Sequence, residues 1–289
     1  MHIVTDGGAD LNLSAEECAA LGIHIVPLSV TLDGQTYRGA ADISLEAFYD
    51  LLVTSGSFPT TSQPSVGDFA ALYRRLAEQD PEILSIHMSS GLSGTLQAAR
   101  AAAQLAPEAR ITYVDTKTLS AATGWQVEAA ARAIQAGWSK DTILALVAQI
   151  GAVTDSVYTL DDLKFLIHGG RISHMKGLIA SVLNIKPLIG VEKVRGTYVN
   201  LAQARSFSNA IKSAGELVSR KMASGMRLRA QVVHAANPDG AQQLADEIAA
   251  RFKVDWVPVR QLSLVLGAHV GRSMVGVCFA PAGEFESLP

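Results

Sequence analysis

The residues best suited to chemistry lie in one short polar segment, Ser89 to Thr95, with the sequence SSGLSGT. A buried strand, Glu82 to Met88, precedes it and an alanine-rich helix follows it. Free backbone N–H groups and the helix dipole favour an anion at such a helix N-terminus. Ser93 and Gly94 would present a hydroxyl and a backbone N–H side by side, so the segment predicts a site for an anionic group.

Two other polar segments are predicted to follow apolar strands: TDGG at Thr5 to Gly8 and TTSQPS at Thr60 to Ser65. Ligands of parallel sheets collect at the carboxyl ends of the strands. Any one of the three segments, taken alone, is best explained as an ordinary turn with capping residues. Together they indicate an anion site.

The second half of the chain offers two more candidates. Arg171 follows a sharp His-Gly-Gly turn, where it faces solvent or reaches an anion as a forked donor. His269 stands among small residues in GAHVG, just before a strand. A lone histidine is more often structural, but glycine on both sides is typical of a loop that closely approaches a ligand.

The common enzyme motifs are absent from the sequence. No G-x-G-x-x-G follows a strand and no G-x-x-x-x-G-K-[ST] occurs, which leaves a dinucleotide or P-loop site without support. The seven histidines form no H-x-x-x-H or H-E-x-x-H pair, so no metal site is predicted. A serine hydrolase using Ser93 and His269 stays open as an alternative, because a sequence does not show which side chains converge.

These residues must be positioned by two different kinds of folded unit. Up to residue 154, strands alternate with helices, which predicts a three-layer α/β domain with a mainly parallel sheet. Within it, Ile23 to Leu32 alternates like a single strand. From Asp155 the pattern is that of an α+β domain with a mixed sheet, and it includes a helix at Met175 to Leu183. We therefore expect two tightly packed domains, 1–154 and 155–289.

Composition limits the partners and the compartment. The 289 residues carry a formal net charge of −3 and no basic run, so nucleic acid is not an expected partner. Cys18 and Cys278 are distant in sequence and fit reduced, buried thiols. No apolar run is long enough to cross a bilayer and the N-terminus is not a signal peptide. A cytoplasmic chain without stable membrane insertion is expected.

Taken together, the segments resemble the DegV family along nearly the whole chain. The matching pieces are IVTDGGADL, TTSQPSVGDF, SIHMSSGLSGTLQAA, DDLKFLIHGGRIS, LNIKPLI and GAHVG. The resemblance implies two domains with a long-chain fatty acid buried between them, and no cofactor. It also implies that Thr61 and Ser93 hydrogen-bond the carboxylate. In the same way the resemblance implies help from the backbone at Ser62 and Gly94, and places His269 close to the head group. Arg171 and Arg205 match family arginines near the mouth of the site, which implies a role in docking or toward the incoming phosphate.

The family also implies a partner. Several members are the fatty-acid-binding subunit of bacterial fatty acid kinase, in which a separate subunit phosphorylates the bound acid and the acyl-phosphate enters phospholipid synthesis. The chain would then be a carrier and not itself an enzyme. One departure concerns docking: the family's last motif usually reads His-x-Gly-Pro-Gly, and here Arg272 replaces the proline. A site for another apolar acid, such as an isoprenoid or a hydroxy acid, is a third interpretation.

Overall fold

The computed structural model describes residues 1–39, 41–172 and 185–289. The helix predicted at Met175 to Leu183 lies outside the described residues. The described chain forms three sheets, with strands alternating with helices around a parallel sheet in the first half and a mixed sheet in the second. The predicted fold class is confirmed.

A four-stranded parallel sheet forms the centre of the first half, in the order β2-β1-β6-β7. Val4 and Ile83 pack on one face beneath two helices, while their neighbours Ile3 and Leu84 belong to the core on the opposite face. Both faces are covered because side chains alternate along each strand. The strands are β1 (His2–Asp6), β2 (Ile23–Val26), β6 (Glu82–His87) and β7 (Arg110–Asp115). The helices are α1 (Ala15–Ala20), α2 (Leu45–Thr54), α3 (Val66–Ala77), α4 (Thr95–Ala102), α5 (Ala121–Gln135) and α6 (Lys140–Val153), with a 3₁₀ turn at Ala103–Leu105.

A small antiparallel sheet corrects two sequence-based expectations. The stretch from Ile23 to Leu32 is not one strand: β2 ends at Val26, and β3 (Ser29–Leu32) belongs to a separate sheet. Pro27 separates them, since it has no N–H to give to a ladder. Residues 60–62 were expected as a turn after an apolar strand, but they form a strand themselves, β5 (Thr60–Ser62), paired with β3. The third strand is β4 (Gln35–Tyr37).

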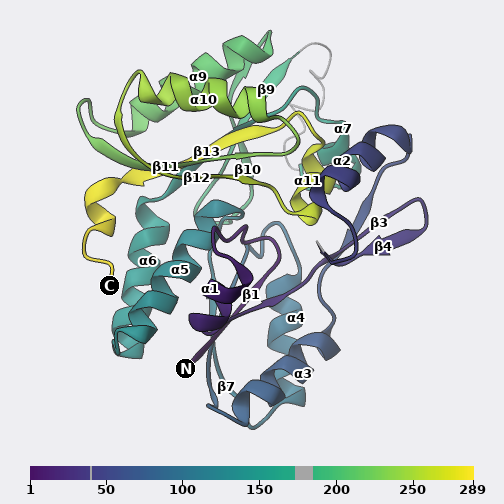
Figure 1. Cartoon of the computed structure of the whole chain (residues 1–289), viewed down its shortest axis with the longest axis vertical. Helices are drawn as coiled ribbons and strands as arrows, with labels where there is room; N and C mark the ends of the chain where they lie inside the picture. The colour runs from purple at the N-terminus through teal and green to yellow at the C-terminus, as the bar shows by residue number, and fades with distance from the viewer. Residues whose placement is uncertain (40, 173–184) are drawn as a thin grey trace.

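The second half is built on a six-stranded mixed sheet, in the order β10-β9-β8-β13-β11-β12. Only β11 and β12 are parallel; the other neighbours are antiparallel. In Figure 1, α9 (Phe207–Lys221) and α10 (Pro238–Ala249) cover the outer face of this sheet, and α5 and α6 lie on its other side. The strands are β8 (Asp155–Thr159), β9 (Lys186–Val191), β10 (Tyr198–Ala204), β11 (Arg227–His234), β12 (Lys253–Gln261) and β13 (Val275–Pro281). The remaining helices are α7 (Lys164–His168) and α11 (Leu264–Val270), with a 3₁₀ turn at Ala282–Phe285.

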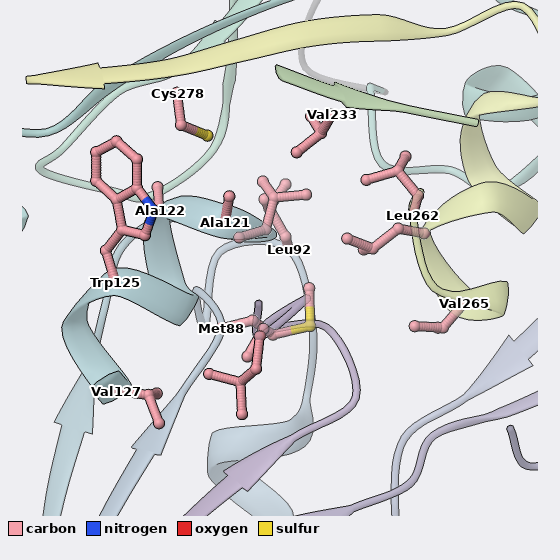
Figure 2. Close-up of a cluster of buried hydrophobic side chains, with 14 of the residues drawn as sticks. Met88, Leu92, Ala121, Ala122, Trp125, Val127, Val233, Leu262, Val265 and Cys278 are labelled. Atoms are coloured by element: carbon pink, nitrogen blue, oxygen red, sulfur yellow. The ribbon is translucent and has the colours of Figure 1, made fainter. Parts of the chain in front are cut away.

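The two halves share one continuous hydrophobic core. Met88, Leu92 and Trp125 from the first half are buried in the same cluster as Leu262, Val265 and Cys278 from the second. Figure 2 shows Met88 and Leu92 between α5 and the segment that carries Leu262 and Val265. Both cysteines are free and buried, as predicted. The six-stranded sheet begins at Asp155, while the exact division at 154/155 stays a prediction.

Candidate functional site

A cavity of about 230 Å³ lies where the two halves meet. It is lined by residues from β5, from the loop between β6 and α4, from the segment after α7, from the start of β10 and from α11. These residues are Leu28, Thr61, Ser62, Gln63, Met88, Leu92, Ser93, Gly94, Arg171, Tyr198, Val265, Leu266 and His269. No aspartate or glutamate is among these lining residues, so within the described chain the only formal charge on the wall is that of Arg171.

Ser93 and Gly94 occupy the position that the sequence predicts. Gly94 is the N-cap of α4, so the first backbone N–H groups of that helix begin beside the cavity. Ser93 Oγ lies 2.8 Å from Thr95 Oγ1 and accepts a longer hydrogen bond of 3.3 Å from Thr95 N. The Ser93 side chain is half-buried and is therefore held in place while part of it faces the cavity.

Thr61 and His269 meet across the cavity wall although 208 positions separate them. Thr61 lies in the middle of β5, and His269 lies in the last turn of α11 rather than in a loop. A hydrogen bond of 2.8 Å joins Thr61 Oγ1 and His269 Nε2. Thus the small antiparallel sheet of the first half holds a hydroxyl against an imidazole of the second half.

The segment after α7 brings Arg171 to the same place. Gly169 lies so close to the imidazole that an added Cβ would be 2.3 Å from His269 Nδ1, which requires glycine there. Arg171 donates from Nη1 to the Gly169 carbonyl and is half-buried. Burial of His269, followed by the positive charge of Arg171, lowers the pKa of the imidazole to about 4. His269 is therefore neutral at pH 7, so one of its ring nitrogens donates a hydrogen bond and the other accepts one.

A small apolar pocket lies beside the cavity, and we call it the apolar continuation. A second, narrow cavity of about 10 Å³ shares Tyr198 and Leu266 with the first. Its other lining residues are largely apolar: Leu119, Ser120, Tyr158, Ile189, Leu262, Val270 and Met274. Tyr198 is 7% exposed, and burial raises its pKa to about 12, which keeps the phenol neutral. The site thus has a polar end and an apolar end.

The structure brings six of the seven predicted residues together: Thr61, Ser62, Ser93, Gly94, Arg171 and His269 all line the first cavity. Arg205 does not join them. It follows β10, is exposed, and is not among the described residues that line this cavity. Gln63 and Tyr198 also line the cavity and were not predicted as site residues. Gln63 lies inside a motif that was singled out, whereas nothing local in the sequence marks Tyr198 as a cavity residue.

Comparison with known proteins decides the family. A family model described as "Uncharacterised protein, DegV family" matches residues 1–282. The chain belongs to the DegV family. Among curated relatives it is 35% identical to a DegV domain-containing protein of Deinococcus radiodurans, over 96% of this chain and 95% of that one. It is 30% identical to Protein DegV of Bacillus subtilis, over 89% and 91% of the two chains.

Solved structures of DegV proteins share the fold. A fatty-acid-binding DegV family protein from Thermus thermophilus has a TM-score of 0.88 and 31% identity, covering 97% of this chain and 99% of that one. DegV of Bacillus subtilis, described as a fatty acid binding protein, has a TM-score of 0.85 and 29% identity, covering 96% and 98%. The two-domain α/β arrangement of the DegV family is therefore that of this chain.

The serine hydrolase alternative gains no support from this DegV structure. Among the described residues, Ser93 bonds to Thr95 and His269 bonds to Thr61, with no hydrogen bond between Ser93 and His269. No acid among the described residues of the cavity wall could orient the imidazole. The arrangement lacks the connected nucleophile, base and acid that the reaction needs.

A different Asp–His–Ser chain is buried under the site. Asp6 Oδ2 lies 2.9 Å from His87 Nδ1, and His87 Nε2 lies 2.7 Å from Ser85 Oγ. All three are at most 1% exposed and none lines a described cavity, so substrate does not reach them. Asp6 also accepts from Met88 N at 3.0 Å, which ties the end of β1 to the start of the loop that carries Ser93. This network was not predicted from the sequence.

Among the described residues, no group of three or more His, Cys, Asp or Glu side chains could hold a metal ion. None of the described helices combines the length and the apolar character needed to cross a membrane.

The depressed pKa of His269 predicts a pH-dependent stability. In the unfolded chain this imidazole takes up a proton near its ordinary pKa of 6.5, whereas in the folded protein it does so only near 4. Its contribution to stability is therefore complete above pH 6.5 and is lost as the pH falls from 6.5 to about 4. We expect urea unfolding to show a larger loss of unfolding free energy over this range in the wild type than in His269→Asn. Equal losses in the two proteins would contradict the assignment.

Proposed function

We propose that this chain binds a long-chain fatty acid with the carboxylate in the cavity of Thr61, Ser93 and His269 and the tail in the apolar continuation. The observation that supports it most strongly is the make-up of the wall: hydroxyls, a neutral imidazole and one arginine converge, and no described lining residue is acidic. The described binding function of the Thermus and Bacillus DegV proteins points the same way. The division into domains 1–154 and 155–289, with the lipid between them, is part of this proposal.

The tail would supply most of the affinity. Burying one methylene group contributes about 0.8 kcal/mol, so a chain with about sixteen carbons offers on the order of 10 kcal/mol before the costs of ordering. The continuation is narrow in the structure, about 10 Å³. Tyr198 and Leu266 line both cavities and form the junction between them. A long tail can therefore enter the apolar continuation only if these two side chains move.

The carboxylate head group needs hydrogen-bond donors, but it does not need a strong opposite charge. An unpaired buried carboxylate costs several kcal/mol or takes up a proton. The carboxylate would accept hydrogen bonds from the hydroxyls of Thr61 and Ser93 and from backbone N–H groups at Ser62 and Gly94. Arg171 would add a positive field at the same site. Because hydroxyl and amide donors are neutral, one carboxylate oxygen would stay available as a nucleophile.

A carboxylate oxygen that stays available as a nucleophile could be phosphorylated by a kinase. We propose that a separate fatty acid kinase subunit, acting in the cytoplasm, phosphorylates the bound acid in line with one carboxylate oxygen, and that the acyl-phosphate serves phospholipid metabolism. The kinase would bring the nucleotide and metal, since this sequence has no nucleotide motif. Exposed Arg205 and Arg272 are proposed as contacts for that subunit rather than for the lipid.

The ligand itself provides the test. Organic extraction of the purified protein followed by mass spectrometry should yield a long-chain fatty acid, and the delipidated protein should rebind palmitate or oleate. Addition of ATP should convert the bound acid to acyl-phosphate only when a fatty acid kinase subunit is present. A delipidated protein that binds neither acid would overturn the binding proposal, whereas binding without conversion would remove the kinase step alone.

A further inference from the structure

Ser89 belongs to the polar segment that carries Ser93, yet it does not line the cavity. It is fully buried where the two halves meet. Its hydroxyl donates a hydrogen bond of 2.7 Å to the carbonyl of Gly196, in the turn between β9 and β10. The same oxygen accepts from Gly91 N at 3.1 Å. One hydroxyl therefore joins the head-group loop of the first half to a turn of the second half.

The backbone of Ser89 holds the rest of that loop. Its N–H donates to Thr118 O at 2.8 Å, and its carbonyl accepts from Leu92 N and Ser93 N, each at 3.1 Å. Ser93 is thus bonded directly to the residue whose side chain crosses to the other half. A displacement of Ser89 would be passed on to the Ser93 backbone through these short bonds.

The turn that receives the hydroxyl is itself well ordered by hydrogen bonds. The Glu192 carboxylate accepts from Val194 N at 3.0 Å and from Arg195 N at 2.7 Å, and Gly196 N donates to Glu192 O at 2.9 Å. The turn ends at Tyr198, which lines both the polar cavity and its apolar continuation. The Ser89–Gly196 bond therefore sets the distance between two walls of one site.

The contact leaves no room for side chains. Gly196 has a φ of +69°, and an added Cβ there would lie 1.9 Å from Ser89 Oγ. An added Cβ at Gly91 would lie 2.4 Å from the carbonyl oxygen of Arg195. Both backbones approach closely only because each presents glycine.

We infer that Ser89 and Gly196 form an interdomain latch, and that Ser89 is a positioning residue which keeps Ser93 and Gly94 against the Tyr198 wall while ligand is bound. This inference rests on the proposed fatty acid site. The latch controls how long a ligand stays rather than whether the chain folds. Opening it moves the head-group donors away from the carboxylate and speeds release.

The test compares palmitate dissociation from Ser89→Ala and from Ser90→Ala by stopped flow. Ser90 is a matched control because its hydroxyl bonds to Asp115 and not to the 192–197 turn. We expect dissociation to be about tenfold faster in Ser89→Ala, if most of the free energy of the lost bond, about 1.4 kcal/mol, lowers the barrier to release, and near the wild-type rate in Ser90→Ala. The unfolding free energy of ligand-free protein, measured in parallel, separates a local effect from general destabilisation.

A double-mutant cycle gives an independent readout. Gly196→Ala directs its methyl group at Ser89 Oγ, so it should speed release on its own. Its effect should shrink in the Ser89→Ala background, where that oxygen is gone, but not vanish, because the positive φ and the contact with Lys117 Cα at 3.1 Å remain. Additive effects, or an unchanged release rate in Ser89→Ala, would overturn the latch. A wild-type protein that binds no palmitate would instead overturn the proposed function, so the two failures are distinguishable.

Discussion

Replacing Thr61 with valine and Ser93 with alanine should weaken fatty acid binding strongly, while the tail site stays intact. Each substitution removes a hydroxyl donor to an anion, and a hydrogen bond to a charged group contributes about 1.5–3 kcal/mol. Each single variant should therefore raise the Kd for palmitate roughly ten- to a hundredfold, as measured by isothermal titration calorimetry on delipidated protein. Thr61→Val should have the larger effect, because it also leaves His269 Nε2 without its partner at 2.8 Å.

The matched controls are Thr60→Val and Ser208→Ala. Thr60 is the neighbour of Thr61 in β5, is exposed and does not line the cavity, while Ser208 is exposed on α9. Both should keep the wild-type affinity. A methyl ester of palmitate offers a second control, because it has no carboxylate. Its Kd should differ far less between the variants and the wild type than the Kd for palmitate does. Unchanged palmitate affinity in both site variants would remove Thr61 and Ser93 from the head-group role.

Much of this site could be predicted because its residues belong to local motifs. Ser93 and Gly94 lie between a buried strand and a helix, and this order alone places them at a helix N-terminus. The class of each half also follows from the order of strands and helices. Local patterns also singled out the segment of Thr61 and the setting of His269, and the resemblance to the DegV family assigned both to the head group. No local pattern connects the two, because 208 positions separate them.

What could not be predicted depends on tertiary contacts. The alternation from Ile23 to Leu32 gives no sign that two strands enter different sheets, although Pro27 marks the place. β5 has only three residues and exists because β3 offers it an edge. Asp6 and His87 look like unrelated polar residues until β1 and β6 pair in parallel and bring them to one end of the sheet. Tyr198 lines the cavity only because the second half of the chain packs on the first.

Replacing Ile189 with phenylalanine should shorten the longest acid that the protein binds well. Ile189 is 1% exposed and lines the apolar continuation, at the far side of the Tyr198 and Leu266 junction from the head group. In the wild type, affinity should rise about fourfold with each added methylene from octanoate toward palmitate, since each contributes about 0.8 kcal/mol. In Ile189→Phe the phenyl ring would take the place of three or four methylenes of the tail. The affinity should therefore stop rising at a shorter chain length, and the Kd for palmitate should increase about a hundredfold.

The comparison with Val191→Phe makes this result specific to the tail. Val191 lies on the same strand two residues on, so its side chain is on the same face of the sheet, but it lines a separate groove near Lys193. Overpacking in either variant would lower stability by about 1–3 kcal/mol, which thermal unfolding would register. Octanoate should bind Ile189→Phe as well as it binds the wild type, because a short tail ends before the ring and the head group keeps its donors. If palmitate lost affinity equally in both variants, or octanoate lost as much as palmitate in Ile189→Phe, the tail would run elsewhere than past Ile189.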